Sequence, residues 1–119
     1  MKSDVVTLTI DMRFPAESIE QAIPLLASVC GRIEAKAGCL DSMVARDSIQ
    51  ETRVRYTETW ASEETFLRHL RSEEFRRVLL AMDMCSEEPG VSIGNFTGHS
   101  GLQYLQQLCD RQGAGEVEE

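Results

Sequence analysis

Two side chains near the middle of the chain could carry a proton during a reaction, Glu58 and His69. An imidazole titrates close to physiological pH, and burial can raise the pKa of a carboxyl group until it serves as a base. The only tryptophan, Trp60, and the tyrosine Tyr56 flank Glu58 at a spacing of two residues. Side chains two apart share one face of a strand, so these groups would lie together. The stretch therefore predicts proton transfer beside a flat substrate that stacks on Trp60.

The same residues also have structural interpretations. Trp60 could anchor the sheet on a helix, and Tyr56 could be a core residue whose hydroxyl is bonded nearby. Glu58 could form a salt bridge to an arginine such as Arg68 or Arg77, or a hydrogen bond into a loop. The sequence leaves both sets of roles open.

His69 also has a structural interpretation, and the remaining polar side chains are weaker candidates. His69 could equally be a surface or capping residue, and His99 is interpreted as a loop residue. Asn95 falls inside a predicted strand, where asparagine is unfavourable, so it would either face a pocket or mark a bulge. Cys39 has no basic neighbour in the sequence, and a packing role is predicted for it.

The spacing of apolar residues predicts the elements that hold these side chains. Strands are expected over four ranges: 6–14, 39–47, 52–60 and 91–97. A long amphipathic helix is expected over 16–36, on a stripe that includes Ile19 and Ala37. Two shorter helices should begin at the N-caps Ser62 and Ser72, each followed by two acidic residues that suit a helix N-terminus. Ser100 should open a final, additional C-terminal helix.

This order is β-α-β-β-α-β with the second helix split in two, which is the ferredoxin-like arrangement of an α+β fold with an antiparallel sheet. One face of such a sheet has no helices, and here it would carry Thr7, Thr9 and Arg55. That face is too polar for a monomer core, so a second copy is expected to cover it and to close a dimeric α+β barrel. Arg53 and Arg55 are predicted to form ion pairs across that interface.

Length and composition exclude several classes of protein. The 119 residues predict one domain over 1–111 and a disordered acidic tail over 112–119. A net charge of −8 disfavours nucleic acid and anionic membranes as partners. No apolar run reaches the ~18 residues of a membrane span, and no signal peptide is expected. The four cysteines lack C-x-x-C spacing, so we expect reduced thiols in a cytoplasmic protein and no metal site.

Taken together, the motifs resemble those of the antibiotic biosynthesis monooxygenase family, within the dimeric α+β barrel superfamily. The resemblance covers roughly residues 5–98. Besides the first strand, the matching motifs are Gly38-Cys39-Leu40, Glu58-Thr59-Trp60 with Ser62, His69-Leu70, and Ser72 to Phe75. The resemblance implies a homodimer with a pocket between sheet and helices in each subunit. It also implies oxygen chemistry without flavin, metal or any other cofactor.

From this resemblance we expect a cofactor-independent monooxygenase-like protein that acts on a small aromatic or quinol-type substrate with O2. His69 or Glu58 would be the catalytic base, and the substrate anion would pass an electron to O2 in a dry cavity. Four side chains would line the substrate pocket: Tyr56, Trp60, Phe66 and Asn95.

Two rival functions stay open, and with them the question whether the protein is an enzyme. One is a non-catalytic dimeric protein that binds small molecules or is associated with stress. The other is a cofactorless isomerase or lyase on the same barrel, working by proton transfer alone. Haem degradation is disfavoured, because the apolar face of the first strand has no Asn and the helix position expected for a haem-binding His falls near Leu79.

Overall fold

The computed structural model describes residues 5–94 and 105–110. Its elements follow the predicted order: β1 (Val6–Arg13), α1 (Ile19–Ile33), β2 (Cys39–Arg46), β3 (Arg53–Trp60), α2 (Glu63–His69), α3 (Glu73–Asp83) and β4 (Gly90–Ile93). Residues 105–110 form a further helical segment. The predicted α+β, ferredoxin-like fold is confirmed.

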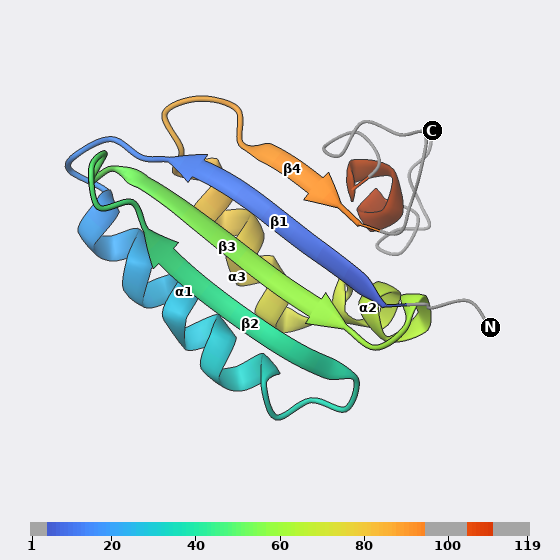
Figure 1. Ribbon diagram of the computed structural model, residues 1–119. Helices are drawn as coiled ribbons and strands as arrows, with labels where there is room; N and C mark the ends of the chain where they lie inside the picture. The colour runs from blue at the N-terminus through green and yellow to red at the C-terminus, as the bar shows by residue number, and fades with distance from the viewer. Residues whose placement is uncertain (1–4, 95–104, 111–119) are drawn as a thin grey trace.

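The four strands form one antiparallel sheet in the order β2-β3-β1-β4. Figure 1 shows α1 and α3 behind this sheet, while the face toward the viewer carries no helix. As predicted, Thr7, Thr9 and Arg55 point to that open face, because their strand neighbours are buried on the other side. The sheet of the single chain is open and is not a closed barrel, so closure would require a second copy.

Strict alternation in the two central strands builds the core. Buried residues of β1 are Val6, Leu8, Ile10 and Met12. Those of β3 are Val54, Tyr56, Glu58 and Trp60. Each buried apolar side chain stabilises the fold by about 1.5–3 kcal/mol, which strongly specifies this register. The register sets Glu58 opposite Leu8, so a carboxyl group lies in the middle of an apolar layer.

Helix α1 is shorter than the predicted range 16–36. A turn in which Ser18 N–H donates to the carbonyl of Pro15 precedes it, and a turn from Lys36 N–H to the carbonyl of Ile33 follows it. The predicted stripe is therefore wrong at Ala37, which is exposed beyond the helix end. The buried face is formed by Ile19, Ala22, Leu26, Val29, Cys30 and Ile33.

Both predicted serine N-caps are confirmed. The Ser62 hydroxyl accepts a hydrogen bond from Thr65 N–H at 3.1 Å, and Thr65 completes a capping box. The Ser72 hydroxyl accepts from Phe75 N–H, also at 3.1 Å. Each cap satisfies a backbone donor that the first turn of a helix leaves free. The two caps divide the second helical region into α2 and α3.

At the C-terminal end, β4 stops at Ile93, where the predicted strand ran to residue 97. Asn95, the start of the predicted final helix and the predicted tail over 112–119 lie outside the described residues. Within 105–110, Leu105 and Leu108 are buried against the core. No helix in the described ranges is long and apolar enough to cross a membrane.

Gly38 is the position where the connection from α1 to β2 depends most on glycine. Its φ is +93°, and an added Cβ would lie 2.6 Å from Cγ2 of Thr65. We expect Gly38→Ala to lower the free energy of unfolding by about 1–3 kcal/mol, because both the backbone and the contact are strained. Urea denaturation followed by circular dichroism measures this loss.

Gly31→Ala is the matched control. Gly31 lies inside α1, and a Cβ there meets nothing within 4 Å. Alanine in a helix is favoured over glycine by about 0.5–1 kcal/mol, so this variant should be slightly stabilised. Equal effects of the two substitutions would contradict the account of Gly38.

Candidate functional site

A buried carboxylate with three side-chain donors is the most polar feature of the core. The Tyr56 hydroxyl donates to Oε2 of Glu58 at 2.5 Å, and Trp60 Nε1–H donates to Oε1 at 2.9 Å. Nε2 of His69 lies 2.9 Å from the same Oε2. Glu58 has no exposed area, so these contacts replace the water that it loses on folding. We call these four side chains the Glu58 cluster.

The end of α2 brings His69 to this carboxylate. The ring stacks on Trp60 with centroids 4.6 Å apart and meets the Phe75 ring edge-on at 5.4 Å. On its far side, Nδ1 lies 3.3 Å from the Ser72 hydroxyl. Because Ser72 N–H also donates to the carbonyl of His69, the cap of α3 and the position of the imidazole are fixed together.

The donors and acceptors of the cluster fit one arrangement of protons. An indole N–H can only donate, and a carboxylate can only accept. The Ser72 oxygen accepts from Phe75 N–H and has one proton left, which Nδ1 of His69 can accept. In that arrangement a neutral His69 carries its proton on Nε2 and donates it to Glu58, and every polar atom has a partner.

The environment of the cluster keeps the Tyr56 hydroxyl protonated. Burial raises the pKa of the Tyr56 phenol well above its ordinary value, and the charge of Glu58 raises it further. Tyr56 therefore stays protonated and remains a donor at any physiological pH. The predicted alternative of a salt bridge to Arg68 or Arg77 is wrong, since the partners of Glu58 are the other members of the cluster and Arg68 pairs with Glu64.

The structure brings together four of the six predicted site residues. Tyr56, Glu58, Trp60 and His69 share the cluster, and each is no more than 2% exposed. Phe66 is also fully buried in the core. Asn95 lies outside the described residues. The cluster is thus a closed core site, with almost no exposed surface through which a bound molecule could touch it.

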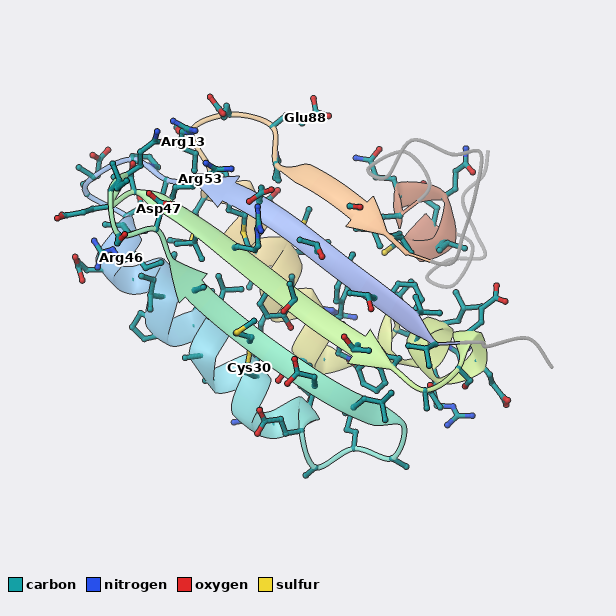
Figure 2. The ribbon with its side chains drawn as sticks, viewed as in Figure 1. Arg13, Cys30, Arg46, Asp47, Arg53 and Glu88 are labelled. Atoms are coloured by element: carbon teal, nitrogen blue, oxygen red, sulfur yellow. The ribbon has the colours of Figure 1, made fainter. Side chains whose placement is uncertain are left out.

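The described chain has cavities away from the cluster. One of about 570 Å³ lies between α3 and the segment 105–110. Another of about 330 Å³ lies at the end of the sheet where Figure 2 shows Arg46, Asp47 and Arg53. Arg53 and Arg55, which were predicted to form ion pairs across a dimer interface, both pair with Asp11 of their own chain, at 3.7 and 3.2 Å.

The cysteines and acids offer no centre for a metal or a nucleophile. The described residues contain no group of three His, Cys, Asp or Glu side chains that could hold a metal ion. All four cysteines are free thiols. Burial raises the pKa of Cys39, and its thiol donates weakly to the carbonyl of Asp41, which agrees with the predicted packing role.

Sequence reasoning missed Ser72 as a member of the site. It identified this serine only as an N-cap, whereas the structure shows a second contact to His69. A signal was present in the spacing, because a serine three residues after a histidine at a helix end can turn back toward the ring. It could not be used without knowing how α2 and α3 meet.

The hydrogen bonds of Glu58 can be tested by stability. Tyr56→Phe removes one donor and should lower the free energy of unfolding by about 1.5–3 kcal/mol. Glu58→Leu leaves three buried donors without an acceptor and should cost about 3–5 kcal/mol. Denaturant unfolding, followed by Trp60 fluorescence, measures both losses.

Glu51→Leu is the matched control. Glu51 is exposed in the loop before β3, and its replacement should change stability by no more than about 0.5 kcal/mol. If Glu58→Leu cost no more than this control, Glu58 would not be the shared acceptor of the core.

Comparisons with known proteins place this geometry in a family. The family model described as antibiotic biosynthesis monooxygenase matches residues 5–79, more than half of the chain. That span contains the whole Glu58 cluster together with Ser72 and Phe75. No curated protein matches the sequence.

Several solved structures share the fold. A conserved protein from Methanosarcina mazei Go1 has a TM-score of 0.70 and 18% identity, covering 78% of this chain and 93% of that one. A protein of unknown function from Bacteroides thetaiotaomicron VPI-5482, described as a possible oxidoreductase, has a TM-score of 0.72 and 18% identity. The match covers 80% of this chain and 100% of that one. An antibiotic biosynthesis monooxygenase has a TM-score of 0.68 and 17% identity, and the match covers 78% of this chain and 99% of that one. With the match of the family model, the chain belongs to the antibiotic biosynthesis monooxygenase family.

Proposed function

We propose that this protein is a cofactor-independent monooxygenase-like enzyme that acts on a small aromatic or quinol-type substrate. The observation that carries the proposal is the Glu58–His69 pair, held at 2.9 Å inside an apolar core. A histidine oriented by a buried carboxylate is a common general base, and a dry surrounding strengthens its action. Family membership supports the same chemistry.

In the proposed reaction, His69 removes a proton from an activated carbon or hydroxyl of the substrate while Glu58 stabilises the imidazolium that forms. For a methylene between aromatic rings, the carbanion gives one electron to O2, and the carbon radical and superoxide then join in a C–O bond. Cleavage of the O–O bond with loss of water leaves a carbonyl. One oxygen atom enters the product and the other becomes water, so O2 accepts all four electrons that the carbon loses.

The closed cluster sets a condition on this mechanism. His69 is 2% exposed, so a substrate reaches it only after local movement. The helix that carries it, α2, has only seven residues, and so short a helix can move as a unit. We propose that substrate binding moves α2 outward and that its return excludes water.

Oxygen uptake tests the proposal directly. With anthrone and a naphthoquinol as probes, the protein should consume O2, and His69→Gln or Glu58→Gln should lower turnover at least about 100-fold. Glu64→Gln is the matched control, because Glu64 lies on the same helix but is exposed and pairs only with Arg68. Each variant is assayed below its own melting temperature.

Absence of uptake with every probe would overturn the assignment. Uptake without an effect of His69→Gln would keep the activity and reject only the base. Product formation without O2 would instead favour the isomerase.

A non-catalytic binding protein is the second candidate, favoured by the closure of the Glu58 cluster. All four side chains are hydrogen-bonded or stacked with one another, as expected for a structural core. Ligand binding without O2 uptake would support this function. The four free cysteines suit the cytoplasmic location that we propose in either case.

We further propose that the active form is a homodimer closed through the open face of the sheet. Thr7, Thr9, Thr57 and Thr59 on the central strands are only half-buried there, and Met43 beside them is 50% exposed. A layer of short hydroxyl and methyl groups is flat enough for a second sheet to pack on it. The pairing would also bury the exposed methionine.

Native mass spectrometry of the whole chain should show a dimer, and Thr9→Arg should shift it to monomer by placing two cations at the centre of the contact. Leu80→Arg is the control, since Leu80 is 55% exposed on α3, on the helix side of the sheet. A monomeric wild-type protein, or dissociation by Leu80→Arg alone, would contradict the proposed interface.

A further inference from the structure

The cavity between α3 and the segment 105–110 has the size and lining of a ligand site. Its volume of about 570 Å³ falls within the 300–1,000 Å³ or so of small-molecule pockets. Leu79 and Met82 of α3 form one wall, and Leu105 and Cys109 form the opposite wall. Burial raises the pKa of the Cys109 thiol to about 11, so this wall is uncharged at neutral pH. The body of a bound molecule would therefore meet an apolar surface.

Three carboxylates line the cavity beside these apolar residues. Asp83 ends α3, Glu88 lies on the loop before β4, and Asp110 lies on the opposite helical segment. Figure 2 shows Glu88 on that loop. No lysine, arginine or histidine of the described ranges lines the cavity.

Some acids of the described ranges are paired with a cation, whereas the three exposed carboxylates of the cavity are not. Asp11, Glu20, Glu64, Glu74 and Glu87 each contact an arginine or a lysine. The three acids of the cavity form no ion pair within the described residues. Unpaired carboxylates that line one cavity attract a positively charged group.

The cavity lies mostly outside the span that the family model matches. That match ends at residue 79, whereas the loop with Glu88 and the segment 105–110 lie beyond it. The Glu58 cluster lines no part of the cavity, so a molecule bound there would not touch the cluster.

We propose that this cavity binds a small amphipathic cation, a molecule with an apolar body and one protonated amine. Its body would pack between Leu79, Met82 and Leu105, where each buried Å² contributes about 25 cal/mol. Its ammonium group would lie among Asp83, Glu88 and Asp110. Anions of the same shape are excluded by charge. The inference goes beyond the proposed oxygenase and does not depend on it.

Three probes of one shape test the charge. Isothermal titration of the whole protein at low salt compares 4-phenylbutylamine, 4-phenylbutanol and 4-phenylbutyrate. We expect the amine to bind at least about tenfold more tightly than the alcohol and the carboxylate to bind least, because three exposed ion pairs contribute about two- to fivefold each. Added salt should weaken only the amine. Equal affinities, or no binding of the amine, would overturn the proposal.

Substitutions test the place. The triple variant Asp83→Asn, Glu88→Gln and Asp110→Asn should reduce the preference for the amine over the alcohol to about twofold or less. The control carries Glu17→Gln and Glu51→Gln with Glu63→Gln, which removes the same charge at exposed positions outside the cavity. Retention of the preference in the first variant, or its loss in the control, would reject the three carboxylates.

Methyl NMR locates the bound probe without any substitution at the site. In protein labelled at the methionine methyl groups, 4-phenylbutylamine should shift the signal of Met82, which lines the cavity. The signal of Met43, which is exposed on β2, should not move. A shift of Met43 with none at Met82 would place the binding elsewhere and overturn the proposal.

Discussion

The acceptance of three hydrogen bonds by one buried carboxylate is the interaction on which the arrangement of this core depends. Removing Glu58 from water costs several kcal/mol unless its partners replace the lost hydration. Tyr56 and Trp60 supply two donors from the same strand, which requires the alternation of β3 to continue without a break. His69 supplies the third and must arrive from another element. The lengths of β3 and α2, and the cap of α3, are therefore linked through one side chain.

That linkage explains which features could be predicted from the sequence. Alternation alone placed Tyr56, Glu58 and Trp60 on one face, and the two serine caps marked the starts of α2 and α3. The partner of Glu58 could not be predicted, because arginines and a histidine lie at similar distances along the chain and only the packed direction of α2 selects His69. Local turns account for the difference between the predicted and the observed end of α1. The turn after Ile33 left Ala37 exposed outside the predicted helix.

The Glu58 cluster and the cavity beside α3 lie in different parts of the molecule. The Glu58 cluster lies within the part that the family model matches, is closed, and combines stability with an arrangement suited to proton transfer. The 570 Å³ cavity is lined by α3 on one side and by the loop before β4 and the segment 105–110 on the other, and it is open, largely apolar and edged by acids. A closed polar core and an open acidic cavity impose opposite demands on a ligand, so the two are best treated as separate sites.

The most direct test of the central claim is the position of the proton on His69. Two-dimensional 15N NMR of the imidazole rings, with His69→Gln to assign the signals, distinguishes this ring from His99. With Glu58 as the shared acceptor, Nε2 should carry a proton that exchanges slowly with water, while Nδ1 accepts from Ser72. A proton on Nδ1 with Nε2 bare would mean that Glu58 is the donor of that pair, and it would contradict the account.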